Sequence, residues 1–154
     1  GTSVTVTGIS TFNSLTDLRG GMRVHGTREN VDAGTINTSG GTGNHKVTLD
    51  LGSSTVFDLT LSDNVDFFEL ANIPTDGGTF TLKLSQDSVG GRTALIDEFK
   101  TTSPATIPVY WPGGVVPTMT STASRTDIYS FKFFDGNNIA SAGLYGVVGG
   151  QNFS

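Results

Sequence analysis

The C-terminal stretch from Asp127 to Phe153 constrains the fold more than any other part of the chain. Residues 128–134 alternate between two sets of side chains, the two-residue period of a β-strand. Residues 135–138, Asp-Gly-Asn-Asn, suit a tight turn, and residues 144–148 are rich in strand-forming types. An apolar hairpin of this kind needs a sheet to pack on, which the rest of the chain is expected to supply. The rings expected on one side of its first strand are Tyr129, Phe131 and Phe133.

The remaining chain has the composition of short strands joined by glycine-rich turns. It has 154 residues, of which 35% are hydrophobic, 15% are charged and 21 are glycine, and no long helical period is visible. This pattern predicts an all-β fold, an antiparallel β-sandwich of jelly-roll type, over residues 42–154. The strands are expected near Lys46–Asp50, Ser54–Leu61, Val65–Leu70, Gly78–Ser85, Arg92–Ile96, Ile107–Trp111, Thr126–Phe134 and Gly143–Val148.

Residues 1–41 differ from the rest and are predicted to form an extended, glycine-rich N-terminal arm. The few apolar side chains of this segment offer too little surface to offset a backbone ordering cost of roughly 1–2 kcal/mol per residue. We therefore expect the arm to pair with a neighbouring chain and to act in attachment. A glycine-rich run, Ser39–Asn44, reads as its flexible link to the sandwich. The alternative is that the arm folds back as edge strands of the same sandwich.

Charge and composition argue against several classes of protein. The formal net charge is −5 and the nine basic residues are scattered, so a nucleic-acid partner is not expected. The absence of cysteine excludes disulfides and thiolate metal sites. No apolar run approaches the length of a membrane span, so no membrane insertion is expected.

The chain carries no recognisable catalytic motif, and we expect neither enzymatic activity nor a cofactor. Its two histidines, at positions 25 and 45, lie in or beside the glycine-rich N-terminal part, where a packed site is difficult to build. Carboxylates could form a glycosidase pair, at Asp97 with Glu98 or at Asp63 with Asp66. Acidic oxygens at positions 50, 63 and 66 could also hold a structural cation, but they lack the dense spacing of a calcium loop. We predict no catalytic residues and no metal ligands.

Several motifs, taken in their order, resemble a module of bacteriophage virion proteins that is frequent at the ends of tail-fibre chains. The resemblance covers about residues 47–153, and an N-terminal piece, Val6–Phe12, is similar to the glycine-punctuated repeats of fibre shafts. The chain departs from the module at Ile96–Pro108, where a tighter turn is usual. The motifs that carry the resemblance are Gly78–Asp87, Trp111–Gly114 with Pro117–Thr118, Thr126–Phe131 and Gly146–Phe153.

The resemblance implies a viral structural protein without catalytic residues. Such a chain would be a tail-fibre or capsid-decoration component, assembled in the host cytoplasm and exposed on the virion surface. It would associate with itself, most commonly as a homotrimer, and residues 1–41 would contact other virion proteins. A carbohydrate- or receptor-binding adhesin of a tail fibre, with a host surface glycan as partner, is the alternative. A polysaccharide-degrading enzyme is a third, weaker candidate.

Four aromatic residues are candidates for glycan or subunit contacts. Trp111 stands before Pro-Gly-Gly, where its ring either plugs one end of the sandwich or stacks on a sugar. Phe68 follows another phenylalanine, and neighbouring residues face opposite sides of a strand, so one of the two rings needs cover. The remaining candidates are Tyr110 and Tyr145.

Overall fold

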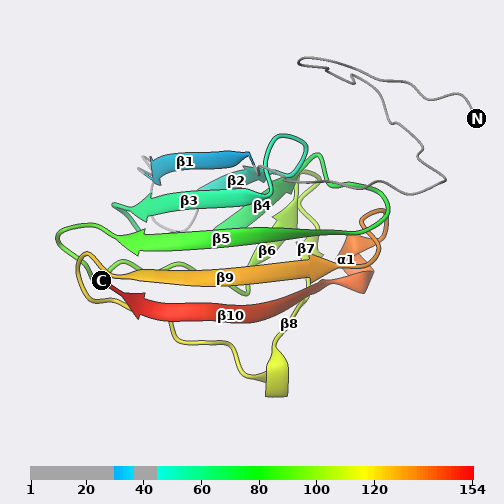
Figure 1. The fold of residues 1–154 in the computed structure, drawn as a ribbon. Coiled ribbons are helices and arrows are strands. Elements are labelled where there is room, and N and C mark those ends of the chain that lie inside the picture. The colour runs from blue at the N-terminus through cyan, green and yellow to red at the C-terminus, as the bar shows by residue number, and fades with distance from the viewer. Residues whose placement is uncertain (1–29, 37–44) are drawn as a thin grey trace, which may run out of the picture.

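The computed structural model describes residues 30–36 and 45–154, which are predominantly β-structure. These residues form one sheet of six strands, ordered β1-β3-β5-β9-β10-β8, and one of four, ordered β2-β4-β6-β7 (Figure 1). The elements are β1 (Val31–Ile36), β2 (Lys46–Asp50), β3 (Val56–Leu61), β4 (Phe67–Ala71), β5 (Gly78–Gln86), β6 (Phe99–Thr101), β7 (Thr106–Ile107), β8 (Val109–Tyr110), a 3-10 turn (Pro112–Gly114), β9 (Thr126–Phe133), α1 (Ile139–Ala142) and β10 (Leu144–Phe153).

From β1 to β6 the chain alternates between the two sheets. Each odd-numbered strand lies in the six-stranded sheet and each even-numbered strand in the four-stranded sheet. Consecutive strands within one sheet are therefore parallel, because the chain returns to its starting end through the other sheet. This winding resembles the coils of a β-solenoid, in which the crossover is another strand and not a helix.

The winding keeps a constant register across the first three strands of the larger sheet. Val31 lies opposite Val56, and Val56 lies opposite Thr81, so 25 positions separate the partners in both pairs. The amino-acid sequence shows no repeat of 25 residues. The regular spacing is therefore seen only in the way the backbone strands pair. The backbone is thus wound in regular coils, although the sequence does not predict a solenoid.

The C-terminal half of the chain completes the larger sheet with antiparallel strands. β9 pairs with β5 on one side and with β10 on the other, and the predicted hairpin is present with α1 inserted after its turn. β9 occupies an internal position of the sheet, and the short β8 pairs in parallel with the first two residues of β10. The expectation of antiparallel pairing throughout is wrong: five of the eight strand pairs in residues 31–36 and 46–153 are parallel.

The two sheets share one core that is rich in aromatic rings. Phe80 and Phe131 stack across β5 and β9 with 5.0 Å between ring centroids, and Phe99 of the other sheet packs 6.1 and 5.0 Å from them. Phe57 meets Phe80 edge-on at 6.3 Å. As predicted, the rings of Tyr129, Phe131 and Phe133 are all buried.

Most predicted strands are confirmed, with shifts of one to two residues at many ends, although β10 continues five residues beyond Val148. The predicted strand Ile107–Trp111 is instead divided between β7 and β8, which lie in different sheets. The expected strand at Arg92–Ile96 is wrong, because Ala94 forms only an isolated bridge to Val65. The stretch Ile96–Pro108, where the chain departs from the module, contains β6 and β7 and supplies Phe99 to the core.

One strand of the larger sheet comes from the segment predicted to be an arm. β1 forms the outer edge of that sheet and pairs with β3 over all six of its residues. This part of the predicted arm thus matches the alternative in which the segment returns as an edge strand. Residues 1–29 and 37–44 lie outside the described residues. They include the whole predicted link, His25 and all of the arm except Asn30 and β1.

The packing predicts a large cost for removing the central ring. We expect Phe99→Ala to lower the free energy of unfolding by about 3–5 kcal/mol, because truncation of a buried aromatic ring leaves a cavity that the two sheets cannot close. Phe134→Ala is the control, since that ring is 65% exposed. Chemical denaturation of the two variants makes the comparison. Equal costs would contradict the placement of Phe99 at the centre of the core.

Candidate binding groove

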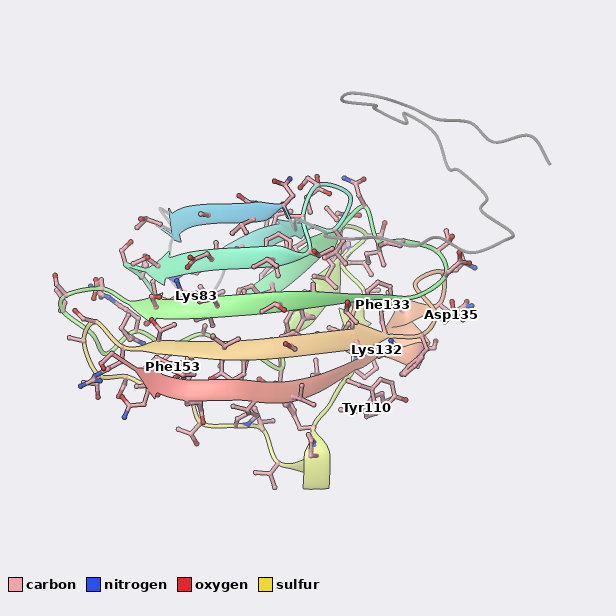
Figure 2. The ribbon with its side chains drawn as sticks, in the orientation of Figure 1. Lys83, Tyr110, Lys132, Phe133, Asp135 and Phe153 are labelled. Atoms are coloured by element: carbon pink, nitrogen blue, oxygen red, sulfur yellow. The ribbon has the colours of Figure 1, made fainter. Side chains whose placement is uncertain are left out.

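The outward face of the six-stranded sheet is hollowed near the end of β9. The hollow, here called the aromatic groove, has a volume of about 540 Å³. Figure 2 shows Lys132 near the end of β9, and Tyr110 beyond β10. The groove is lined on its outer side by Thr79, Thr81, Ser130, Lys132, Phe134, Tyr145 and Val147.

Strand register arranges these side chains in two rows across the sheet. In one row Lys132 of β9 lies between Thr79 of β5 and Tyr145 of β10, and Tyr110 of β8 extends the row by pairing with Tyr145. In the next row Ser130 lies between Thr81 and Val147. Residues directly opposite each other in a sheet have Cβ atoms about 5 Å apart, so each row is a continuous strip of side chains.

Two exposed aromatic rings, Phe134 and Tyr145, line one side of the groove, and a third, Tyr110, packs against Tyr145 beside it. Tyr110 and Tyr145 lie 5.2 Å apart between centroids, and Phe134 meets Tyr145 edge-on at 5.5 Å. Between 46% and 65% of each residue's surface is exposed. Of the four exposed aromatic residues in the described chain, Tyr145 contacts two, Tyr110 and Phe134, and the fourth, Phe153, lies at the far end of β10. An exposed apolar cluster of this kind commonly marks a binding surface.

The polar groups of the groove have few partners inside the protein. Lys132 Nζ lies 5.1 Å from the centre of the Phe134 ring and forms no ion pair with any residue in 30–36 or 45–154. The side chains of Thr79, Thr81 and Ser130 form no hydrogen bond with another described residue. These hydroxyls and the ammonium group are therefore available to a ligand.

Two of the four predicted contact residues border the groove and two lie in the core. Tyr110 and Tyr145 are exposed, whereas Phe68 is completely buried and stacks on Phe99 at 5.3 Å. Trp111 is 7% exposed and packs edge-on against Tyr129 and Phe131. The Trp111 ring is thus part of the core, and its buried Nε1–H has no hydrogen-bond partner in the described chain.

Sequence reasoning did not single out Lys132, Phe134 or the two threonines. The alternation of residues 128–134 places Lys132 and Phe134 on the face opposite the core, so the signal for their exposure was present. The pairing of Lys132 with Thr79 and Tyr145, and the contact of Phe134 with Tyr145, depend on the strand order β5-β9-β10, which local alternation does not specify.

A buried carboxylate holds the C-terminal end of β10 in place. Asp127 is 1% exposed, and its Oδ2 accepts hydrogen bonds from the Thr120 backbone N–H at 2.7 Å and the Tyr129 hydroxyl at 2.9 Å. Its Oδ1 accepts from the Asn152 N–H at 2.9 Å, and Gln151 Nε2 donates to the Thr118 carbonyl and the Tyr129 hydroxyl. The network connects β9, the loop before it and the end of β10.

The hydrogen bonds determine the pKa of this carboxyl. Burial alone raises the pKa of Asp127, but the N–H groups of Thr120 and Asn152 and the hydroxyl of Tyr129 outweigh it, and the net effect lowers the pKa below 3.8. Burial, together with the hydrogen bond and negative charge of Asp127, raises the pKa of Tyr129. Asp127 is therefore ionised and Tyr129 protonated at neutral pH.

Two of the predicted acidic candidates, Asp66 and Asp50, have structural partners. Asp66 Oδ2 accepts from the His45 N–H, and Asp50 Oδ1 accepts from the Gly52 N–H and from Asn72 Nδ2. The described part of the chain contains no group of three or more His, Asp or Glu side chains placed to hold a metal ion. No helix among residues 30–36 and 45–154 is long and apolar enough to cross a bilayer.

Comparison of the chain with protein-family models, with curated proteins and with solved structures finds no match.

The Asp127 network predicts a pH-dependent contribution to stability. A carboxyl whose pKa is lowered by folding stabilises the protein above its unfolded pKa, and this contribution is lost as the pH falls through the folded pKa. We expect Asp127→Asn to cost about 1–3 kcal/mol at pH 7, because an amide cannot accept from all the donors that surround the carboxylate. The cost should shrink once the pH falls below 3.8.

Denaturant unfolding at pH 7 and in acid measures this difference. Asp32→Asn, on the exposed strand β1, is the matched control and should show little cost at either pH. A cost for Asp127→Asn that is unchanged in acid would contradict the ionised state of the buried carboxyl.

Proposed function

We propose that this chain is a non-enzymatic structural protein of a bacteriophage virion, a tail-fibre or capsid-surface decoration component built on a β-sandwich. The fold is compatible with the resemblance on which this proposal rests. Three of the resembling motifs coincide with neighbouring strands: Gly78–Asp87 with β5, Thr126–Phe131 with β9 and Gly146–Phe153 with β10. Motifs dispersed in the sequence thus lie side by side in one sheet.

The observation that carries the structural role is an exposed apolar border of this sheet, here called the β10 edge. β8 pairs only with Leu144 and Tyr145, so no other strand of the described chain flanks β10 beyond them (Figure 1). A strand edge with exposed apolar side chains is a template for pairing with another chain. The exposed apolar residues on β10 and on the loop after β8 are Val115, Val116, Val147, Val148 and Phe153.

The partner that we assign to this edge is a second copy of the chain. Closed symmetric association would bury the same apolar residues on every copy. The resemblance to fibre proteins favours a homotrimer, with residues 1–41 contacting other virion proteins. Such particles assemble in the host cytoplasm and expose the protein on the virion surface.

A carbohydrate-binding adhesin is the second candidate, and the contact between Tyr110 and Tyr145 favours it. Aromatic rings that are partly exposed at a groove offer apolar faces to the C–H surfaces of sugars. The groove adjoins the β10 edge on the same sheet, and the two regions share Val147.

Self-association can be tested with one substitution that introduces a charge on the β10 edge. We expect the wild-type protein to have the mass of a trimer by light scattering at micromolar concentration. Val148→Lys should dissociate it, because a buried ammonium group without a partner is costly. Val89→Lys is the control, since Val89 is 73% exposed on a turn at a distance in sequence from the β10 edge. A monomeric wild-type protein would contradict the assignment.

Two truncations separate attachment from folding. Deletion of residues 1–29 should leave the thermal midpoint unchanged and abolish incorporation into particles. Deletion of residues 1–41 should also lower the midpoint, because it removes β1 and leaves β3 as an open edge. Differential scanning calorimetry and particle assembly assays give the two readouts. A midpoint that falls already in the shorter deletion would contradict an attachment role for residues 1–29.

A further inference from the structure

We propose that the aromatic groove binds an acidic glycan, a sugar chain that carries carboxylate groups, and that Lys132 recognises the carboxylate. The inference rests on the second proposed function and adds the ligand class and the residue that selects it. In the bound state the Lys132 ammonium donates to the carboxylate, the ring of Tyr145 packs on a pyranose face, and hydroxyls of the sheet bond sugar hydroxyls.

Charge is the first argument for an acidic ligand. The chain has a formal net charge of −5, yet the single charged residue that lines the groove is a lysine. Two of the other three lysines on the strands have carboxylate partners: Lys83 pairs with Asp58 at 2.8 Å and Lys46 with Glu69 at 3.0 Å, whereas Lys100 of the smaller sheet lies over the Phe67 ring. Lys132 has no such partner among the described residues, so a ligand carboxylate would meet an uncompensated positive charge.

The position of the ammonium group is the second argument. The contact with the exposed Phe134 ring holds Lys132 at the same end of the groove as the tyrosines. Register places Lys132 directly opposite Tyr145, so a carboxylate bonded to Nζ would belong to a sugar within reach of the Tyr145 ring. One ring and one charge in adjacent positions match a hexuronic acid unit, in which a carboxylate extends from a pyranose.

The hydroxyl row supplies the third argument. Thr81 and Ser130 face each other across β5 and β9, with Val147 on the next strand. Their hydroxyls have no hydrogen-bond partner among the described residues, so they are free to donate to and accept from sugar hydroxyls. A volume of about 540 Å³ lies in the range of small-ligand sites and is sufficient for a short oligosaccharide.

Calorimetric titration of the full-length protein with two probes tests the proposal. The probes are an oligogalacturonate, which carries one carboxylate per sugar, and a maltooligosaccharide of equal length, which carries none. We expect the acidic probe to bind at least about tenfold more tightly, with an affinity that falls as salt is raised. Equal affinities would overturn the proposal and leave neutral glycan binding standing. Binding of neither probe would overturn both.

Matched variants assign the effect to the groove. Lys132→Met keeps the apolar stem and should weaken binding of the acidic probe at least about tenfold, with no change for the neutral one. Lys100→Met is the control, because Lys100 Nζ lies 4.0 Å from the Phe67 ring in the other sheet and has a similar environment. Equal effects of the two substitutions would overturn the role of Lys132.

Tyr145→Ala separates glycan binding from self-association. It should weaken binding of the acidic probe while the mass by light scattering stays that of the wild type, and the thermal midpoint should stay close to the wild-type value because the ring is exposed. The contradicting result has two parts: the Tyr145→Ala variant loses the oligomer, and the wild-type protein binds no glycan. Together they would show that the groove is a subunit contact and would overturn the proposal.

Discussion

The contact of Phe99 with the stacked rings of Phe80 and Phe131 is the interaction on which the rest of the structure depends. It connects a three-residue strand of the smaller sheet to two central strands of the larger one, at centroid distances of 5.0–6.1 Å. Aromatic rings bury more area than other side chains and prefer such stacked and tilted geometries. Six buried phenylalanines thus share the core of the described chain with eight buried leucines.

This buried contact also determines what the outer face presents. Because side chains alternate along a strand, fixing Phe80 and Phe131 inward fixes their neighbours outward, and a one-residue slip would exchange the two faces. The inward pairing of Phe80 with Phe131 is thus the reason that Thr79 lies beside Lys132 and Thr81 beside Ser130. The groove and the β10 edge are consequences of the same register.

Local alternation made the inward and outward residues of β5 and β9 predictable. The C-terminal hairpin was predictable from its turn residues, and the burial of Trp111 was one of the two positions expected for that ring. The parallel winding was not predictable, because it depends on pairing between strands about 25 residues apart that carry no sequence repeat. Phe99 was missed for a related reason: its strand is three residues long and follows two acidic residues, so it shows no period. Tyr110 and Tyr145 were identified as candidates by residue type, but the contacts of Tyr145 with Tyr110 and Phe134 required the strand order.

The most direct test of the account is a map of where a ligand contacts the sheet. Backbone amide NMR spectra recorded during titration with an oligogalacturonate would supply it. The account predicts shifts confined to the groove strands, largest for Thr81, Ser130, Lys132 and Tyr145. Shifts centred on the opposite sheet, around Phe67 and Lys100, or no shifts at saturating ligand, would contradict it.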